Sequence, residues 1–206
     1  MLKVALTGGI ATGKSYVRAR VAARGVPTLD ADAIVHGLLS PGSDAAADVA
    51  RRFGPRVVQP DGGIDRKALG SLVFGDAAAR RDLESIVHPR VYARITEWAA
   101  WQDDAGARWV LADIPLLFET RHERDFDRVI VASCSQAEQV RRVMQRDGLE
   151  EEAALARLAA QWPLGDKVRR ATVVIDTGGT FDETDRQVDA VFRVIDAAAV
   201  AARSRA

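Results

Sequence analysis

The residues with the clearest chemical meaning lie near the start of the chain. They read Gly8-Gly9-Ile10-Ala11-Thr12-Gly13-Lys14-Ser15, which fits the spacing G-x-x-x-x-G-K-[ST]. Glycines at these places let successive backbone N–H groups converge on phosphate oxygens, because a side chain would block both the turn and the approach. The spacing predicts a nucleotide site in which Lys14 reaches the β- and γ-phosphates and the Ser15 hydroxyl binds Mg²⁺.

The segments on either side of this loop are those that such a loop requires. Residues 2–6 form a short apolar run that predicts a buried parallel strand, and residues 15–24 read as a helix that ends at Gly25. The positive end of that helix adds to the attraction for an anion. The alternative is a glycine-rich turn with a solvated lysine, which the flanking strand and helix disfavour.

Two carboxylates follow the next apolar segment, in Thr28-Leu29-Asp30-Ala31-Asp32. The carboxyl ends of neighbouring parallel strands share one edge of the sheet, so one of these aspartates can face a γ-phosphate and accept a proton from an acceptor hydroxyl. If a helix starts at Ala31, Asp30 becomes its N-cap. We therefore predict Asp30 as a cap or supporting group and Asp32 as the base; the alternative is that both are caps or surface acids.

A third acidic residue, Asp113, ends the apolar run 109–112. A carboxylate at the end of that strand can organise Mg²⁺, directly or through water. Pro115 then forces the chain out of the strand. The apolar residues 115–118 are typical of core packing beneath a site, and the role of Glu119 stays open.

Arginines on a predicted helix after the fourth strand form the last chemical pattern. Arg142 and Arg146 are four residues apart and share a face, and Arg141 stands beside them. Guanidinium groups on such a face can close over a triphosphate and donate several hydrogen bonds to it. The alternative is a solvated, salt-bridged helix, because glutamates follow at positions 150–152.

Composition narrows the class of protein. The 206 residues carry 29 basic and 29 acidic side chains, so no overall basic field favours nucleic acid or an anionic membrane. A single cysteine, Cys134, excludes an internal disulfide and a multi-cysteine zinc site, and we expect it to be a small buried residue. Without a long apolar run or a leader pattern, we expect the cytoplasm and neither a nucleic-acid nor a membrane partner. The oligomeric state is not indicated.

Strand-like apolar runs alternate with helical patterns, which is typical of an α/β fold with a parallel sheet. The predicted strands are 2–7, 26–29, 108–112, 128–132 and 172–175. Capping boxes are predicted at Ser135 with Glu138 and at Thr180 with Glu183.

The stretch from Ala33 to Trp101 differs from the rest because it has helical pattern and turns but no convincing core strand. Its helical pieces are 44–53, 66–74 and 76–101, the last interrupted near Pro89. An insertion of this length predicts a helical lobe beside the phosphate loop. In nucleotide-type kinases such a lobe holds the acceptor.

Taken in order, these motifs resemble the dephospho-coenzyme A (dephospho-CoA) kinase family over residues 1 to about 195. The phosphate loop alone is shared by many families, whereas the Asp-Ala-Asp, His-Pro and Pro-Leu-Leu-Phe-Glu elements together are much more specific. The elements are Thr7–Ile10 with Gly13–Ser15, Asp30–Asp32, Val87–Pro89, Asp113–Glu119, Arg142 with Arg146–Gly148, Gln161, and Val174–Asp176 with Gly178.

The resemblance implies ATP-dependent phosphorylation of the ribose 3′-hydroxyl of dephospho-CoA, which is the last step of coenzyme A biosynthesis. It also implies an α/β fold, with a parallel five-stranded sheet of P-loop kinase type, a helical substrate-binding insertion and a helical lid. The expected nucleotide-binding core is 1–32, 105–137 and 168–200, the acceptor lobe is 33–104 and the lid is 138–167.

Carried over position by position, the resemblance makes Asp32 the general base, Lys14 a catalytic residue, and His88 a contact to the acceptor phosphate or ribose in the lobe. The alternative for His88, a helix histidine before a proline, is a structural role. Asp32 and His88 are thus the expected acceptor-binding residues. Mg²⁺ is expected directly on Ser15 and through water on Asp113. The predicted ATP-binding residues are Gly8, Gly9, Ala11, Thr12, Gly13, Lys14, Ser15, Tyr16, Arg142 and Arg146.

Three positions depart from the family pattern. Tyr16 stands where the family usually has Thr, with an expected effect on packing around the nucleotide. Thr172 takes the place of an acid before the last strand. Thr177 replaces an Asn in a segment expected near the adenine, so a relaxed nucleotide preference is expected.

Two alternatives to this function stay open. The nearer one is another small-molecule or nucleoside monophosphate kinase of the same architecture, since fold alone does not choose the acceptor. The farther one is a nucleotide-dependent binding or switch protein without catalysis. A guanine-binding switch needs Asn-Lys-x-Asp after a late strand, which this chain lacks.

Overall fold

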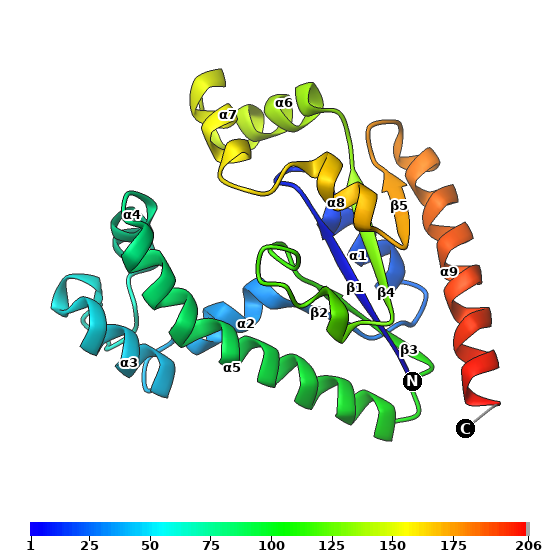
Figure 1. Ribbon diagram of the computed structural model, residues 1–206, viewed down its shortest axis with the longest axis horizontal. Helices are drawn as coiled ribbons and strands as arrows, with labels where there is room; N and C mark the ends of the chain where they lie inside the picture. Colours follow the sequence, from blue (N-terminus) through cyan, green and yellow to red (C-terminus); the bar gives the residue numbers. More distant parts are fainter. Residues whose placement is uncertain (205–206) are drawn as a thin grey trace. The chain divides into compact units, whose positions relative to one another are not determined.

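The structure is a computed structural model that describes residues 1–204. Its centre is a five-stranded sheet with the order β2-β3-β1-β4-β5 (Figure 1), and β1 pairs in parallel with β3 and β4, as β4 does with β5. The predicted parallel sheet and its five strands are confirmed. The strands are β1 (Leu2–Gly8), β2 (Thr28–Asp30), β3 (Trp109–Asp113), β4 (Arg128–Ser133) and β5 (Val173–Asp176).

Helices connect the strands and follow the last of them. They are α1 (Lys14–Ala22), α2 (Ala31–Leu38), α3 (Asp44–Phe53), α4 (Arg66–Phe74), α5 (Ala77–Asp104), α6 (Gln136–Asp147), α7 (Glu151–Ala159), α8 (Leu164–Arg170) and α9 (Phe181–Arg203), with 3₁₀ turns at Pro55–Val57 and Glu123–Asp125. Within residues 1–204, none of the helices is long and apolar enough to cross a bilayer.

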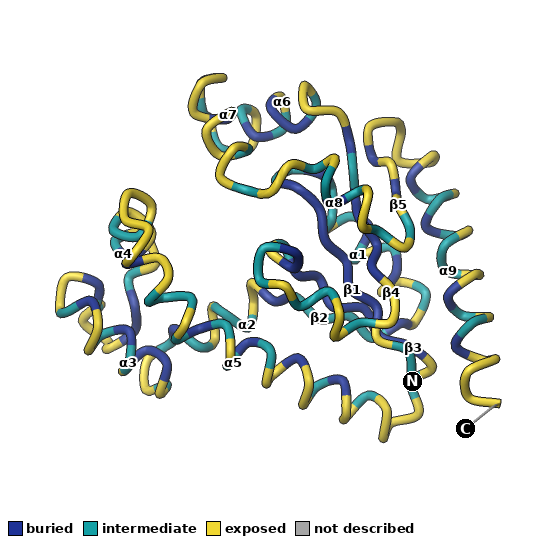
Figure 2. Tube along the Cα trace, viewed as in Figure 1, coloured by how far each residue is buried: buried dark blue, intermediate teal, exposed yellow. Residues whose placement is uncertain are grey.

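The main core lies between the sheet and the helices α1 and α9. Continuous apolar runs in β1, β3 and β4 are buried because helices cover a parallel sheet on its faces. Helix α9 adds Val188, Ile195 and Ala199, which share one helical stripe, and α1 adds Val17 and Val21. Figure 2 shows the resulting contrast between buried strands and a helix α9 that is exposed along its outer side.

The chain divides into two compact units. The first contains Met1–Leu29 and the chain from Ala99 onward, and the second contains Asp30–Trp98. The second unit is helical and holds the sequence segment for which a lobe is predicted. It has apolar side chains of its own that are buried, from α3, α4 and the turns between them: Ala45, Ala46, Val49, Phe53, Val57, Ile64 and Leu69.

The predicted helices 44–53 and 66–74 are confirmed, but the interruption near Pro89 is wrong. Helix α5 is assigned without a break from Ala77 to Asp104, with Pro89 inside it. Proline removes one backbone donor and crowds the carbonyl groups of the preceding turn. The carbonyl that loses its helical donor is that of Ser85, and next to it the Arg90 guanidinium donates to the Ile86 carbonyl at 2.6 Å.

The capping predictions are confirmed in part. At α9 the Thr180 side chain accepts from the Glu183 amide and the Glu183 carboxylate accepts from the Thr180 amide, so the capping box is complete. At α6 the Ser135 hydroxyl accepts from the Glu138 amide at 3.2 Å. The Glu138 carboxylate instead accepts hydrogen bonds from arginines on its own helix, which bears on the site described next.

Candidate active site

The carboxyl ends of four strands meet at one edge of the sheet. The strand register sets Leu6 beside Asp113, Gly8 beside Ala132, and Ser133 beside Asp176. The phosphate loop, which leaves β1 at Gly8, therefore starts where β3, β4 and β5 end. In open α/β sheets this edge is where ligands bind.

Glycine is required at two places in the loop for different reasons. A Cβ atom at Gly8 would lie 2.5 Å from the Ala132 carbonyl oxygen and 2.6 Å from the Thr12 hydroxyl, so no space for a side chain exists. Gly13 has φ of 75°, in the left-handed region that glycine adopts without strain. Ala11 is also left-handed, with φ of 58°, and such strain in a non-glycine residue persists only where the surroundings hold it.

The first turn of α1 is open to an incoming anion. Gly13 is its N-cap and no side chain caps the helix, so the amide groups at its start are not masked by a side-chain acceptor. Lys14 and Ser15 are the first two residues of the helix. The positive end of the helix dipole, the lysine and the hydroxyl group are thus all located at the start of α1, as the predicted phosphate site requires.

A cleft of about 780 Å³ opens over this point. Its walls come from the loop and α1, from α6, and from the connection between β5 and α9. Most of the lining groups near the loop are polar or cationic, which suits a triphosphate. The lining residues are Ala11–Tyr16, Glu138, Arg141, Arg142, Gln145, Arg146, Thr177, Gly179–Phe181 and Thr184.

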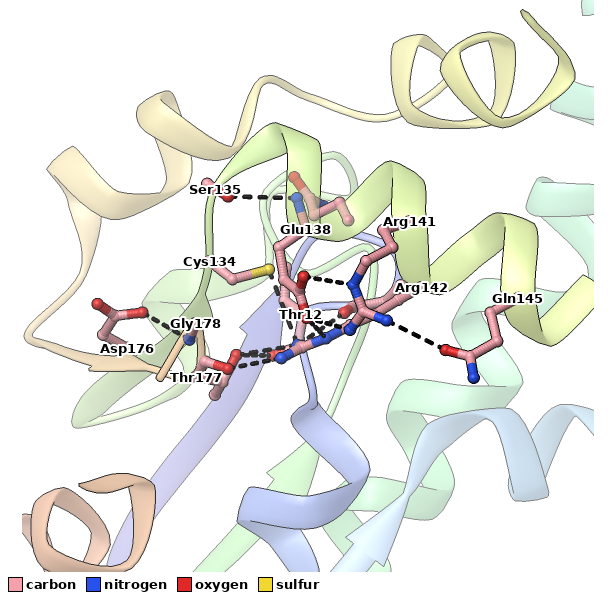
Figure 3. A network of polar contacts seen from close by, with 12 residues as sticks. Thr12, Cys134, Ser135, Glu138, Arg141, Arg142, Gln145, Asp176, Thr177 and Gly178 are labelled. Atoms are coloured by element: carbon pink, nitrogen blue, oxygen red, sulfur yellow. Dashed lines mark hydrogen bonds and ion pairs between the residues drawn. The ribbon is translucent and has the colours of Figure 1, made fainter. Parts of the chain in front are cut away.

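Arg142 spans the cleft from α6 to the loop (Figure 3). Its Nη2 donates to the Thr177 carbonyl at 2.7 Å, its Nη1 to the Ala11 carbonyl at 3.3 Å, and its Nε to Glu138 Oε1 at 2.7 Å. Arg142 is salt-bridged to Glu138, as the alternative expects, but it is half-buried and also contacts the loop; its contact to ATP stays a prediction. Its planar guanidinium group contacts the loop through Nη1 and Glu138 through Nε.

Glu138 organises the arginines at this end of α6. Arg141 donates to both of its carboxylate oxygens, at 2.7 and 2.6 Å, and Arg142 donates to one of them. These hydrogen bonds, of which that from Arg141 contributes most, lower the pKa of Glu138 to about 2. The carboxylate is therefore charged at any physiological pH and fixes the direction of the Arg142 side chain.

Arg146 lines the cleft but is engaged differently. Its guanidinium pairs with Asp147 at 2.8 and 2.9 Å, and the same carboxylate also accepts from Arg157 at 2.5 Å. The salt-bridged alternative thus describes Arg146, although its place in the cleft wall keeps it near a bound nucleotide. A contact to ATP phosphates remains a prediction for this residue.

Thr177, which follows β5 directly, contacts the phosphate loop. Its hydroxyl donates to the Thr12 carbonyl at 2.8 Å, and its side chain is the nearest neighbour of a Cβ built at Gly13, at 3.3 Å. The residue is 5% exposed. Its hydroxyl is thus directed at the loop, and the nucleotide preference expected from this departure stays a prediction.

The other departures are explained by local contacts. The Thr172 hydroxyl accepts from the Val129 amide at 3.0 Å, at the start of the β4–β5 pairing. The Tyr16 hydroxyl donates to Asp185 at 2.9 Å, and its ring lies 4.7 Å from that of Phe181, centroid to centroid. Burial of Tyr16, together with this carboxylate, raises the pKa of the phenol. Tyr16 thus links α1 to α9, and its expected effect on packing around the nucleotide stays a prediction.

Cys134 has the inert environment expected of it. The residue is 8% exposed and free of any disulfide. Burial raises the pKa of its thiol, so little of it is the reactive thiolate.

Asp113 is buried at the end of β3, with 4% of its surface exposed. The Nε of Arg18, one turn along α1 from Lys14, lies 3.5 Å from its carboxylate. Among residues 1–204, no cluster of three or more acidic, histidine or cysteine side chains forms a metal cage. A magnesium ion here would depend on phosphate oxygens and water for most of its ligands, which is usual for Mg²⁺.

The remaining predicted residues belong to the second unit. Asp30 is the N-cap of α2 and accepts from the Asp32 amide at 3.0 Å, which confirms its predicted capping role. Asp32 lies in the first turn of α2 and is exposed. His88 is half-buried within α5. The roles predicted for Asp32 and His88 in binding and catalysis stay predictions.

Sequence reasoning missed a group of residues between α6 and α8 that contacts the phosphate loop. Lys167 of α8 is fully buried and reaches the Gly8 carbonyl, while Gln139 and Gln161 bond to Ile10. Nothing in the local pattern distinguishes Lys167 from a surface lysine of a short helix. The only signal is that Gln161 lies within a motif of the family that the chain resembles.

The strand order and the phosphate loop at the end of β1, with the arginine helix beside it, define this protein as a P-loop kinase in fold and site. A solved structure, TT1252 from Thermus thermophilus, has a TM-score of 0.80 and 35% sequence identity. The match covers 93% of this chain and 96% of that one.

The comparison with protein families is equally direct. The model of the dephospho-CoA kinase family matches residues 2–183. The dephospho-CoA kinase of Geobacillus kaustophilus is 42% identical over 196 residues, which cover 95% of this chain and 98% of that protein. The dephospho-CoA kinase of Symbiobacterium thermophilum is 45% identical over 190 residues, covering 92% and 80%. The chain belongs to the dephospho-CoA kinase family, and it is a phosphotransferase.

Proposed function

We propose that this protein transfers the γ-phosphoryl group of ATP to the ribose 3′-hydroxyl of dephospho-CoA, with the nucleotide in the cleft above the phosphate loop. The family membership supports the reaction, and the loop supports the nucleotide site. The single observation that carries the proposal is the open first turn of α1, which brings helix dipole, Lys14 and Ser15 together under a cleft of about 780 Å³.

In this proposal the loop amides and Lys14 bind the β- and γ-phosphates and neutralise the charge that develops on them. The Ser15 hydroxyl is the protein ligand of Mg²⁺, and Asp113 acts through water. The fit of Mg²⁺ rests on the donor set, because a hydroxyl group stands in the first turn of α1 and a buried carboxylate ends β3, which pairs with the strand that leads into the loop. When bound, the ion would supply positive charge that stabilises the negative charge developing on the transferred group.

Asp32 is the proposed base. It accepts the proton of the 3′-hydroxyl while the sugar oxygen forms a bond to the γ-phosphorus and the bond from that phosphorus to the β–γ bridging oxygen breaks. ADP leaves with the electron pair of that bond. Support comes from the chain itself, since Asp32 follows β2 in the first turn of α2 and Asp30 caps that helix.

Arg142 and Arg146 are the proposed lid residues over the triphosphate. Arg142 already reaches the loop at the Ala11 carbonyl, so a small rotation of its planar head can turn it from the carbonyl to a phosphate oxygen. Closure of segment 138–167 over the cleft would exclude water and so prevent loss of the phosphoryl group to hydrolysis. His88 is proposed as a contact to the acceptor in the lobe.

The test is turnover with a panel of acceptors. Purified protein with ATP and Mg²⁺ is assayed for ADP formation with dephospho-CoA, with nucleosides and with nucleoside monophosphates. We expect acceptor-dependent turnover with dephospho-CoA at a kcat/KM at least about a hundredfold above the others. Preferred turnover of another acceptor would refute the substrate, and ATP binding without any acceptor-dependent turnover would refute the enzymatic proposal.

The cytoplasmic location and the lack of nucleic-acid partners stay predictions. The same holds for the boundaries of core, lobe and lid given by the resemblance.

A further inference from the structure

Lys167 is a lysine without solvent contact. It comes from α8, and its side chain is 0% exposed. Its ammonium group donates to the Gly8 carbonyl and to the Pro115 carbonyl, each at 3.2 Å, and pairs with Glu119 Oε1 at 2.7 Å. An ammonium group has three protons, and these contacts provide three acceptors for them.

Such a group is costly to the fold. Burial lowers the pKa of Lys167, the paired Glu119 raises it, and the positive charge of Lys14 lowers it again. An apolar pair of similar volume is often as stable as a buried ion pair, or more stable. Stability alone therefore gives little reason for a charge at this position. The carbonyl groups that accept from Lys167 give a specific reason, because Gly8 begins the phosphate loop and Pro115 follows β3.

A second set of contacts holds the same loop at Ile10. The Ile10 amide donates to Gln161 Oε1 at 2.9 Å, and the Ile10 carbonyl accepts from Gln139 Nε2 at 2.7 Å. Glu119 also accepts from the Trp162 amide at 3.1 Å. The backbone of the loop is thus hydrogen-bonded at Gly8 and Ile10 by side chains from α6, from the link between α7 and α8, and from α8 itself.

We infer that Lys167, paired with Glu119, is a positioning residue that holds the Gly8 carbonyl so that the loop amides converge on phosphate. The inference rests on the proposed function, since it assumes that the loop receives a triphosphate. Lys167 does not touch the nucleotide in this account. It acts through the backbone at Gly8, and it couples the loop to the segment 138–167 that is predicted to be the lid.

The test compares Lys167→Met with the double variant Lys167→Met/Glu119→Gln. The single change leaves the half-buried Glu119 without its partner charge and is expected to lower Tm. The double change removes both charges, and the new amide still accepts from Trp162, so we expect Tm to recover to near wild type. The matched control is Arg157→Ala, which removes an ion pair to Asp147 in the same segment without touching the loop.

The readouts are independent of the acceptor. We expect the double variant to bind Mg²⁺–tripolyphosphate and Mg²⁺–ATP at least about tenfold more weakly by calorimetry, because hydrogen bonds from a charged donor to the loop are lost. Amide hydrogen exchange of residues 8–15 should become faster in the double variant and stay unchanged in the Arg157→Ala control.

A purely structural role gives a different result. If the double variant recovers Tm and also binds tripolyphosphate like the wild type, with normal exchange in the loop, Lys167 does not position the loop and the inference is wrong. If the wild type binds tripolyphosphate and ATP but does not phosphorylate dephospho-CoA, the proposed function fails instead. A double variant that is stable but weak in binding supports the inference in either case.

Discussion

Replacement of Gly8 by alanine should separate the need for space in the loop from the need for backbone freedom. The new Cβ would lie 2.5 Å from the Ala132 carbonyl oxygen and 2.6 Å from the Thr12 hydroxyl. Carbon and oxygen atoms in ordinary close contact are about 3.3–3.6 Å apart, so an overlap of about 1 Å must be relieved by movement of the loop or of β4.

The magnitude follows from that overlap. Crowding in a packed region costs about 1–3 kcal/mol, and each kcal/mol lowers Tm by about 2–4 °C in a protein of this size. A displacement of about 1 Å in the phosphate-binding groups is expected to lower kcat/KM by about a hundredfold. Gly8→Ala should therefore fold, with Tm lower by about 2–12 °C, and be a very poor catalyst.

Gly25→Ala is the matched control. Gly25 follows α1 with φ of 80°, and a Cβ there meets nothing within 4 Å. The left-handed conformation costs a non-glycine residue about 1–2 kcal/mol, so the loss of Tm should be similar to that of Gly8→Ala. Its kcat and KM should be those of the wild type, because Gly25 lies at the far end of α1 from the loop.

The assay pairs thermal unfolding with ADP release in the presence of dephospho-CoA, and with calorimetric binding of ATP. The reasoning would be refuted if Gly8→Ala kept normal kcat/KM, or if Gly25→Ala lost as much activity as Gly8→Ala. The second outcome would mean that activity follows overall stability and not the geometry of the loop.

The remaining predictions concern the charged groups of the site. Lys14→Ala and Asp32→Asn should each lower kcat by at least about a hundredfold in the ADP-release assay, and near-normal turnover would exclude the assigned role. Arg142→Lys keeps the charge but cannot bond Thr177 and Glu138 together, so kcat should fall by about tenfold while the far-ultraviolet spectrum stays unchanged. The pKa of Glu138 is lowered from 4.5 to about 2, so its stabilising effect is full above about pH 4.5 and is lost as pH falls toward 2. Urea unfolding between these pH values should therefore show a steeper loss of stability in the wild type than in Glu138→Gln, and equal slopes would contradict the ion pairs seen on α6.

Much of the core could be predicted from sequence because its elements are locally encoded. Buried parallel strands are continuous apolar runs, and the glycine spacing of the phosphate loop, framed by a strand and a helix, is typical of one kind of turn. The exception is β2, which starts only at Thr28, since Pro27 has no N–H for the ladder. The capping role of Asp30 also follows from local pattern, because a carboxylate directly before a helix finds the first free amides.

The positions that sequence did not reveal are those decided by contacts between distant segments. Pro89 predicts a break, yet α5 continues through it from Ala77 to Asp104. The pattern around Thr177 does not reveal that its hydroxyl donates to the Thr12 carbonyl, and the predicted effect on nucleotide preference stays a prediction. Lys167 lies far along the chain from Gly8, and no periodicity connects a lysine to a particular backbone carbonyl.

These distant contacts explain why the loop has a single shape. Ala11 is held in the left-handed region, which costs of order 1 kcal/mol or more for a residue with a side chain. The contacts around it come from other parts of the chain: Arg142 bonds its carbonyl, and Gln139 and Gln161 hold the neighbouring Ile10 on both backbone groups. All three side chains belong to the segment between β4 and β5. The conformation that binds phosphate is therefore set by this segment as much as by the glycines, so a movement of the segment during closure would act on the loop directly.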